Sequence, residues 1–391
     1  MSQSNIIVTV DPPWPPVSGA DLRNWNNALA SIEFAPTRLI SLGALRAPET
    51  EVKGIQLLSL SQAHAGEIYR RPPNGSAIDI TIPPGAIENL RFISFKLGPT
   101  NTVVETLLLH PLLGELRPLT KKLVLDLHNV ESDLVRQSGG VLSSIFGRTG
   151  RKVERIRTIE KRAASVVDEF WTCSEIDADR LRDVICGDTP IHLVPNAIPR
   201  LELVPVSRPE RSHGESSPRL LFLGHLNYTP NVLAAKILAR SIFPALRPRF
   251  PEAQLVLAGR NPKTRVNALA GNGVEVVANP VDASGLLTAA DFVVLPITIG
   301  GGTRIKAIEA MAWGIPVVAS KRAVEGLGLV DRVNVRFAET PNQFCEAIGS
   351  LWSDPIAYRA QRDAARQHAL ARFGPEAIAR AVRASFAGTA T

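Results

Sequence analysis

The sequence predicts an α/β protein with two doubly wound, Rossmann-like sheets, and three observations lead to that fold class. The first is length, because 391 residues suggest about two domains on a prior of roughly 150 residues each. The second is a series of short apolar runs without strict alternation, a pattern typical of parallel strands covered on both faces. The third is their spacing, which leaves room for a helix between the later runs.

The apolar runs form two sets separated by a proline-rich segment. Residues 198–218 contain Pro199, Pro205, Pro209 and Pro218 among charges and serines, a composition typical of a linker. We therefore expect an N-terminal domain over 1–200 and a C-terminal domain over 201–374. Strands are expected at 6–10, 38–42, 55–60, 123–127 and 192–195, then at 220–223, 255–258, 274–277, 292–295, 316–319 and 333–337.

Two further segments have helical periodicity. Residues 151–182 are expected to form one or two helices with one apolar face and one rich in Arg and Lys. That basic face is either solvated or a contact for an anionic membrane surface, and both interpretations stay open. Residues 375–386 also carry an apolar stripe at helical spacing.

Composition excludes several classes of protein. Hydrophobic residues make up 45% and charged residues 21%, the balance of a globular chain, and no apolar stretch reaches the roughly 18 residues of a membrane span. The N-terminus does not resemble a secretory signal. Three scattered cysteines argue against a disulfide framework or zinc site and fit the reducing cytoplasm. The net charge of +7 allows an anionic partner, but dispersed basic residues and few aromatics argue against nucleic acid.

The segment 292–319 concentrates the residues that suggest chemistry. An apolar run ending at Leu295 leads to Gly300, Gly301 and Gly302, after which Thr303 opens a helical pattern. A helix N-terminus presents unpaired N–H groups and a positive dipole end, and glycines let a ligand approach the backbone. This arrangement predicts a phosphate site.

Three charged residues on the expected helix extend this prediction. Arg304 and Lys306 place two cations in the first turn, where they oppose the helix dipole unless an anion is bound. Glu309 adjoins the apolar stripe and is suited to accept hydrogen bonds from ribose hydroxyls, although an intrahelical pair with Lys306 is the simpler alternative. The P-loop and dinucleotide-binding motifs are absent.

The run GGGTRIKAIEAMAWGIPVVAS over 300–320 resembles the GT-B fold, retaining glycosyltransferases of family 4, also called glycosyl transferases group 1. The similarity continues in PNA at 195–197, LFLG at 221–224, NYTPN at 227–231 and LAGR at 257–260. In the first half it includes PPVSGADLR at 15–23, DLHNVE at 126–131 and WTCS at 171–174. It is strong in the C-terminal half and loose between about residues 40 and 120.

The resemblance implies two Rossmann-like domains facing across a cleft, with the acceptor on the first, the donor on the second, and a last helix, 375–391, crossing back to the first. It implies a retaining hexosyltransferase that moves a sugar from a nucleoside-diphosphate sugar to an acceptor hydroxyl, in glycan, glycolipid or cell-envelope polysaccharide synthesis. The implied acceptor is a glycan or a lipid-linked molecule. No metal or cofactor is expected, and the expected location is the cytoplasm or the inner face of the plasma membrane.

The resemblance also assigns roles to individual residues. Catalytic roles fall on His128, Arg304 and Glu309. A loop closing over the diphosphate and acceptor comprises Ser18, Gly19 and Arg23. The residues expected to bind the donor are Gly300, Gly301, Gly302, Thr303, Arg304, Lys306, Glu309, Gly224, His225 and Arg260.

Two departures from the family pattern keep other functions open. Gly301 stands where many members have the first of two glutamates, and His225 stands where many carry a basic residue for the diphosphate, a role that Lys236 is a second candidate to fill. The alternatives are a nucleotide-sugar epimerase or hydrolase of GT-B fold, which would consume donor without acceptor, and a non-catalytic protein that binds nucleotide sugars.

Overall fold

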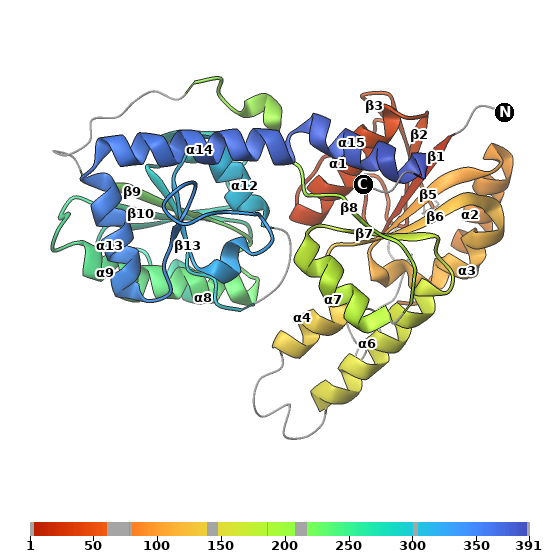
Figure 1. Cartoon of the computed structure of the whole chain (residues 1–391), viewed down its shortest axis with the longest axis horizontal. Coiled ribbons are helices and arrows are strands. Elements are labelled where there is room, and N and C mark those ends of the chain that lie inside the picture. The colour runs from red at the N-terminus through yellow and green to blue at the C-terminus, as the bar shows by residue number, and fades with distance from the viewer. Residues whose placement is uncertain are drawn as a thin grey trace. The chain divides into compact units, whose positions relative to one another are not determined.

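The computed structural model describes residues 4–60, 78, 80–138, 148–185, 187–207, 217–299 and 304–388 (Figure 1). The chain divides into two compact units, the first comprising 1–197 and the segment from Pro375 onward, the second comprising most of 198–374. The division lies between Ala197 and Ile198, close to the boundary expected after residue 200. The C-terminal helix packs in the first unit.

The first unit is built on an eight-stranded sheet whose order is β3-β4-β2-β1-β5-β6-β7-β8. All pairs are parallel except β3 with β4, and Ile7 of β1 lies between Leu39 of β2 and Val103 of β5. The chain builds outward from β1 to β4 and then returns to the other side of β1 with β5. The strands are β1 (Asn5–Thr9), β2 (Thr37–Ser41), β3 (Glu51–Val52), β4 (Ile55–Ser59), β5 (Thr100–Glu105), β6 (Thr120–Leu127), β7 (Glu169–Thr172) and β8 (Ile191–Leu193).

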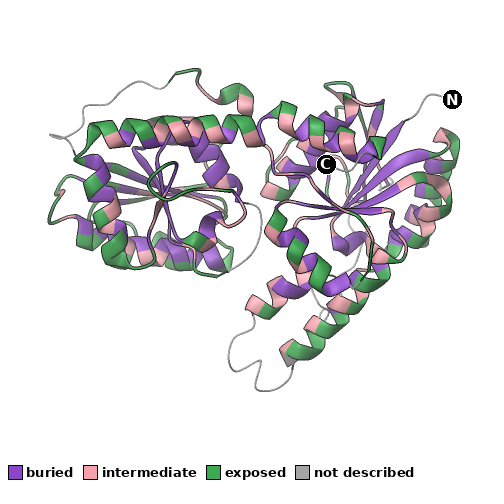
Figure 2. Cartoon of the chain, in the orientation of Figure 1, coloured by how far each residue is buried: buried purple, intermediate pink, exposed green. Residues whose placement is uncertain are grey.

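Helices cover both faces of this sheet, and the strands between them are buried (Figure 2). Trp25 of α1 and Ile378 of α15 share one apolar core with Ile7, while Leu90 of α2 and Ile156 of α6 belong to the core on the other face. The helical segments are α1 (Gly19–Ile32), α2 (Pro84–Leu97), η1 (Leu107–Leu112), α3 (Leu113–Leu116), η2 (Arg117–Leu119), α4 (Glu131–Ser138), α6 (Arg148–Ala164), α7 (Glu175–Ile185) and α15 (Pro375–Ala387).

The second unit has a six-stranded, fully parallel sheet of order β11-β10-β9-β12-β13-β14. Its chain also starts in the middle, at β9, and reverses direction with β12. The strands are β9 (Arg219–Leu223), β10 (Gln254–Gly259), β11 (Val274–Ala278), β12 (Phe292–Leu295), β13 (Val317–Ala319) and β14 (Arg336–Phe337).

One hydrophobic core joins this sheet to its helices. Within it, Tyr358 donates from its hydroxyl to the carbonyl of Asp291 at 2.7 Å, which ties α14 to the start of β12. The helical segments are η3 (Leu201–Leu203), α8 (Thr229–Ile237), η4 (Leu238–Ile242), α9 (Phe243–Leu246), α10 (Thr264–Asn267), α11 (Ser284–Ala289), α12 (Ile305–Ala312), η5 (Lys321–Val324), α13 (Pro341–Trp352) and α14 (Pro355–Phe373).

The predicted fold class is confirmed, but the structure has strands that the sequence pattern does not indicate. β5 begins with polar residues, and they are buried because Asn101 donates from its amide to Oδ1 of Asn5 at 3.2 Å. β7 interrupts the region expected to be helical over 151–182, since the helical stripe ends at Ala164. β14 is shorter than the expected 333–337, because Arg332 has a positive φ of 61° and its N–H closes a turn onto Val335.

Over the described part of the chain, the helices are too short or too polar for any of them to span a bilayer.

Candidate functional sites at the two strand-order reversals

In each unit, residues predicted to be functional lie where the strand order reverses. In open parallel sheets the loops on either side of such a reversal run apart at the carboxyl ends of the strands, which is where ligands bind. In the second unit the reversal lies between β9 and β12. In the first unit it lies between β1 and β5.

Two glycines shape the edge of the second sheet. Gly224 follows β9 and donates from its N–H to the carbonyl of Ala258 at 3.0 Å. Gly259 ends β10 with a φ of +155°, and a Cβ there would lie 1.6 Å from the carbonyl oxygen of Gly224. Glycine is therefore required at position 259, because any side chain would collide with the backbone of the neighbouring strand. The two strands thus end in closely packed backbone.

Lys306 of α12 reaches the same edge. Its Nζ donates to Oδ1 of Asn231 at 2.9 Å and lies 5.7 Å from the ring centre of Phe222, while the Asn231 amide nitrogen donates to the His225 carbonyl at 3.0 Å. Burial lowers the pKa of Lys306 to about 8. Within the described residues no carboxylate pairs with this ammonium group, so it is held by neutral partners and remains available to an anion.

Arg304 is the residue immediately before α12, and its side chain is almost buried. Its Nη2 donates to Oε2 of Glu325 at 2.8 Å, and Nη1 of Arg322 lies 3.3 Å from the same oxygen. The helix start has no side-chain cap at this position. Glu325 therefore orients the Arg304 guanidinium at the end of the helix where backbone N–H groups are unpaired.

Glu309 lies one turn further along α12 and is 8% exposed. Its Oε1 accepts from Nη2 of Arg200 at 3.2 Å, so the intrahelical pair with Lys306 that the sequence allows does not form. Burial raises the pKa of Glu309, and Arg200 opposes that rise. Asn231, the partner of Lys306, belongs to the NYTPN motif at 227–231. Arg200, the partner of Glu309, lies in the irregular linker, and no pattern in the sequence indicates this role.

The remaining residues predicted to bind the donor divide into two groups. His225 and Arg260 follow β9 and β10, where the N–H of Leu226 donates to the Arg260 carbonyl at 2.9 Å, so both lie at the edge that carries Gly224. Gly300, Gly301, Gly302 and Thr303 lie outside the described residues.

In the first unit the reversal carries a buried polar cluster instead. Arg23 of α1 donates from Nε and Nη2 to the two carboxylate oxygens of Asp126 at 2.7 and 2.5 Å, and both side chains are buried. Nη1 of Arg23 also donates to the carbonyl of Val194 at 2.9 Å. Arg23, expected in the loop that closes over the diphosphate and acceptor, lies on α1 with its guanidinium buried against the Asp126 carboxylate.

Ser18 and Gly19 form the start of α1. Ser18 is the N-cap, its hydroxyl accepts from the N–H of Asp21 at 3.1 Å, and the Asp21 carboxylate accepts from the N–H of Ser18 in return. Arg46 donates to the same carboxylate at 2.7 Å. This capping box gives Ser18 and Asp21 structural roles at the start of α1.

His128 follows β6 and lies against the cluster. Its Nε2 is 3.2 Å from Oε2 of Glu105 and 3.8 Å from Oδ2 of Asp126. Burial lowers the pKa of His128 to about 4, so the imidazole is neutral at pH 7. Burial and the neighbouring Asp126 raise the pKa of Glu105. Burial opposes ionisation of Asp126 as well, but Arg23 overcomes it and the pKa of Asp126 falls.

Glu105, Asp126 and His128 are also close enough together to hold a metal ion. The chemistry of the donor set does not favour one, because Arg23 already donates to both oxygens of Asp126. A bound divalent ion would have to displace that guanidinium from a fully buried position.

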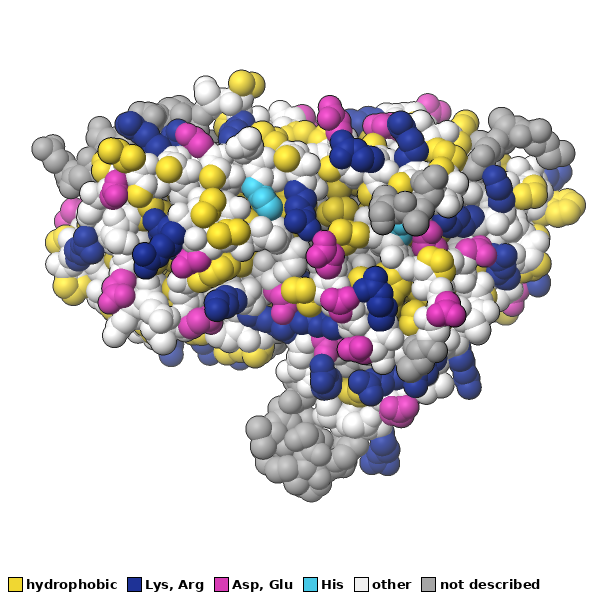
Figure 3. Space-filling model, viewed as in Figure 1, with side chains coloured by type: hydrophobic (Ala, Val, Ile, Leu, Met, Phe, Trp, Pro, Cys, Tyr) yellow, Lys and Arg dark blue, Asp and Glu magenta, His cyan; other side chains and the backbone are white. Residues whose placement is uncertain are grey.

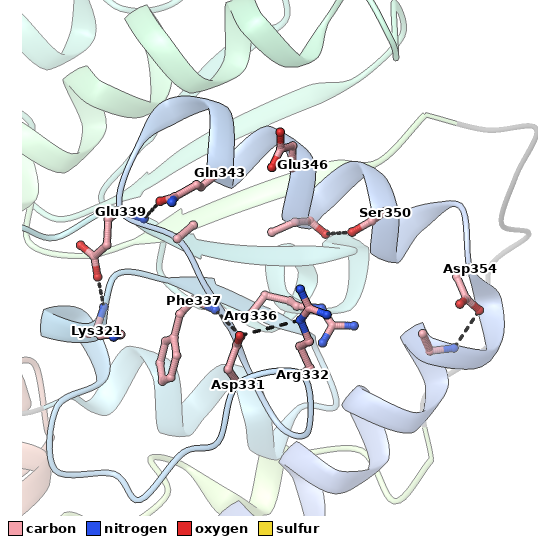
Figure 4. Close-up of a pocket in the computed structure, with 13 residues that line it drawn as sticks. Lys321, Asp331, Arg332, Arg336, Phe337, Glu339, Gln343, Glu346, Ser350 and Asp354 are labelled. Carbon is pink, nitrogen blue, oxygen red and sulfur yellow. Dashed lines mark hydrogen bonds and ion pairs between the residues drawn. The ribbon is translucent and has the colours of Figure 1, made fainter.

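A separate groove of about 690 Å³ lies in the second unit along β14 and α13 (Figure 4). Two of its acidic side chains bond to nearby backbone: Glu339 accepts from the N–H of Lys321 at 2.9 Å and Asp331 from the N–H of Phe337 at 2.9 Å. None of the residues predicted to be functional lines this groove, and we assign no role to it.

Comparisons with known proteins agree with this geometry. Residues 217–354 match the family model for glycosyl transferases group 1, whereas no curated protein matches the chain in sequence. Sucrose-phosphate synthase from Thermosynechococcus elongatus has a similar structure, with a TM-score of 0.75, 18% identity and coverage of 99% of this chain and 100% of that one. For Anabaena HepE in complex with UDP the TM-score is 0.67 and the identity 13%, with coverage of 99% of this chain and 100% of that one. For a glycosyltransferase from Rickettsia africae the TM-score is 0.63 and the identity 13%, with coverage of 97% of each chain.

The fold is thus GT-B, the two-domain architecture of a large class of glycosyltransferases. The segment 217–354, which holds the β9 and β10 edge and α12, is similar to the glycosyl transferases group 1. The resemblance to glycosyl transferases group 1, predicted from the run at 300–320, is confirmed for this segment.

Proposed function

We propose that the protein transfers a sugar from a nucleoside-diphosphate sugar to an acceptor hydroxyl, with retention of configuration at the sugar. The observation that carries the proposal is that Arg304, Lys306 and Glu309 lie at the start of and along α12, next to the strand-order reversal of the second unit. A partly buried ammonium group held by neutral partners, an oriented guanidinium and a buried carboxylate match the diphosphate and ribose of one ligand.

The cations supply the main catalytic effect in this proposal. Negative charge develops on the departing nucleoside diphosphate, and preorganised cations in a buried site stabilise it without reorganisation. Arg304 and Lys306 thereby take the place of a metal ion, so we propose that transfer needs no divalent cation and persists in a chelator such as EDTA. The proton of the incoming hydroxyl passes to the departing phosphate oxygen.

Glu309 is proposed to bind the ribose. An ionised carboxylate accepts hydrogen bonds from the ribose hydroxyls, and Arg200 favours the ionised form against the effect of burial. A sharp test is to compare UDP with its 2′- and 3′-deoxy analogues in wild type and Glu309→Gln. If Glu309 binds the ribose, the analogues bind more weakly than UDP to wild type, and this difference shrinks in the variant. An unchanged difference would place the ribose elsewhere.

The donor is proposed to be a uridine-type diphosphate sugar carrying a hexose, since HepE structures contain UDP and UDP-glucose. His128 is proposed to hydrogen-bond the donor sugar as a neutral imidazole. The acceptor is proposed to be a glycan or lipid-linked hydroxyl, used in the cytoplasm or at an anionic membrane surface. Exposed Lys and Arg side chains on α6 support the membrane site (Figure 3). They are Arg151, Lys152, Arg155, Lys161 and Arg162.

The deciding experiment has two stages. A thermal-shift series with UDP, GDP, ADP and dTDP identifies the base, because a ligand that binds only the native state raises Tm. The matching nucleotide sugars are then incubated with and without candidate acceptors while released nucleoside diphosphate is measured. Transfer predicts release that depends on acceptor and is abolished in Arg304→Ala and Glu309→Ala. Arg332→Ala, which removes an exposed cation beside the groove, is the matched control and keeps full activity.

Two results would contradict the proposal. Undiminished release of nucleoside diphosphate in both Arg304→Ala and Glu309→Ala would show that these residues do not form the donor site. Release that does not depend on any acceptor would instead indicate an epimerase or a hydrolase.

A further inference from the structure

We propose that Glu105 is a neutral carboxylic acid that donates a hydrogen bond from Oε2 to Nε2 of His128, and so fixes the imidazole as the tautomer with its hydrogen on Nδ1. Glu105 is then a positioning residue that acts through His128. The inference rests on the proposed function only in giving His128 a place beside the donor sugar.

Hydrogen-bond accounting around Asn24 supports the proton on Glu105. With its amide nitrogen toward the cluster, Asn24 lies 3.0 Å from Nε2 of His128, from the Ala20 carbonyl and from Oε2 of Glu105. The opposite orientation would set its oxygen against acceptors only. The amide has two hydrogens for these three acceptors. A proton on Glu105 Oε2 resolves the deficit, because it serves Nε2 and leaves the amide hydrogens for the other two acceptors.

The other oxygen of Glu105 is satisfied without a cation. The Asn27 amide nitrogen lies 3.1 Å from Oε1 of Glu105 and 3.1 Å from Oδ2 of Asp126, so it bridges the two acidic side chains. Glu105 is completely buried, and in the described part of the chain no Lys or Arg forms an ion pair with it. An ionised carboxylate without a cation is costly at such a position.

Charge accounting gives the same answer. Arg23 supplies one positive charge and directs Nε and Nη2 to Asp126, so Asp126 is the ionised member of the acidic pair. Two neighbouring buried carboxylates do not both ionise beside a single cation. Burial, the charge of Asp126 and a side-chain hydrogen bond between the two carboxyl groups raise the pKa of Glu105, in agreement with a protonated Glu105 beside an ionised Asp126.

The consequence lies at His128, whose side chain is 12% exposed. Because Nε2 accepts from the acid, the single hydrogen of the neutral ring resides on Nδ1. A ring in this state offers an N–H donor, suited to a sugar hydroxyl oxygen. It is not the acidic imidazolium that an ionised Glu105 at 3.2 Å would stabilise.

The same sheet contains a second buried glutamate that provides a matched control. Glu169 of β7 accepts from Nζ of Lys122 at 2.7 Å and from the indole N–H of Trp171 at 2.9 Å. Its carboxylate therefore faces a cation, as that of Glu105 does not. Replacing each glutamate by glutamine compares a carboxyl group without a cation and one with a cation in a single fold.

The experiment is ¹⁵N NMR of the full chain labelled at its seven histidines, with His128 assigned by its loss in His128→Gln. We expect a neutral ring protonated on Nδ1 from about pH 6 to 8, and the same tautomer in Glu105→Gln, whose amide nitrogen replaces the donor. In Glu105→Ala the tautomer preference is lost and kcat falls about tenfold, the scale of one hydrogen bond, at unchanged nucleotide affinity. Glu105→Gln should shift its urea midpoint less than Glu169→Gln does, because the first change leaves one Asn24 N–H without an acceptor whereas the second leaves the Lys122 ammonium group without its carboxylate.

Three results would overturn the inference. One is an imidazolium at pH 7 in wild type that becomes neutral in Glu105→Gln, which would show an ion pair. Another is a wild-type tautomer protonated on Nε2. The third is a stoichiometric shift of the His128 signal on addition of Zn²⁺ or Mn²⁺ that is lost in Glu105→Gln, which would show a metal centre. Since the tautomer is read without any donor, an absence of transfer activity would refute the proposed function and leave this measurement intact.

Discussion

The two units use the same strand-order reversal for opposite electrostatic purposes. In the first unit the charges at the reversal compensate one another in the interior, with Arg23 held against Asp126 and Glu105 kept neutral. In the second unit Lys306 is held by an amide oxygen and an aromatic ring, and Arg304 is oriented by Glu325 at the start of a helix. In the first site the charges are compensated by their neighbours, whereas the second site remains suited to bind an anion.

The difference shows that fold topology determines where a ligand binds but not which charge it carries. Both sheets direct diverging loops to the carboxyl ends of their central strands. The net charge of each site depends on the partner of its cation. Arg23 contacts a buried carboxylate, whereas Lys306 contacts neutral groups. Four predictions follow from this contrast, in order of expected effect.

The largest effect is expected for Asp126→Asn. Removing the carboxylate leaves the Arg23 guanidinium buried without its partner, a change that typically costs about 3–5 kcal/mol of unfolding free energy. Urea denaturation measures it. Asp179→Asn is the control, because Asp179 pairs with Arg182 at 2.6 Å with both side chains exposed, and such pairs are worth about 0–1 kcal/mol. Equal losses of unfolding free energy in the two variants would show that Asp126 does not compensate the buried charge of Arg23.

The second prediction concerns pH and Glu131, which begins α4 just after His128. Burial, together with Glu160, raises the pKa of Glu131 to about 7 from an ordinary value of 4.5. The folded state therefore holds a proton that the unfolded state releases, so this stabilisation is present below about pH 4.5 and is lost as pH rises through 7. Between about pH 5 and 8, wild type should lose up to about 3 kcal/mol relative to Glu131→Gln. Parallel stability–pH curves for the two proteins would contradict the assignment.

The third prediction tests the open site through Lys306. Lys306→Ala should weaken nucleoside-diphosphate binding by about 10- to 100-fold, because a charge-assisted hydrogen bond contributes about 1.5–3 kcal/mol. Since the pKa of free Lys306 is about 8 and a bound anion favours the charged form, affinity should fall as pH rises above 8. Calorimetric titration at several pH values measures both effects. Lys306→Arg is the control, which should bind without that alkaline decline because a guanidinium stays charged; a decline of the same size in it would assign the pH dependence to another group.

Sequence patterns predict the parts of this molecule that are local. The buried parallel strands appear as apolar runs, and the candidate anion site appears because Arg304, Lys306 and Glu309 share one helix next to one strand. β5 and β7 are not predicted, because the first begins with buried polar residues and the second is four residues long between helices. Periodicity does not indicate strands of either kind.

Long-range partners are the part that the sequence does not reveal. Arg23 resembles a loop residue in its motif, yet its carboxylate partner lies 103 positions away. Asn231 is 75 positions from Lys306, and Arg200 is 109 from Glu309. Which charge meets which partner depends on packing across the sheet, and this pairing sets the electrostatic difference between the two sites.

The smallest effect is expected for Arg200→Ala, which leaves the donor-binding side chains in place and changes only the environment of Glu309. Arg200 is the cation that opposes the effect of burial on this carboxyl, so its removal raises the pKa of Glu309 further. At alkaline pH nucleotide affinity should change by less than about threefold, the scale of a partly exposed ion pair. At acidic pH the variant protonates Glu309 more readily than wild type does, and a protonated carboxyl accepts from ribose hydroxyls less well, so affinity should fall more steeply with acidity than in wild type. Affinities of wild type, Arg200→Ala and Glu309→Gln at alkaline and acidic pH measure this. The double variant Arg200→Ala with Glu309→Gln should lose the acid sensitivity; if it keeps it, a titratable group other than Glu309 causes the pH dependence.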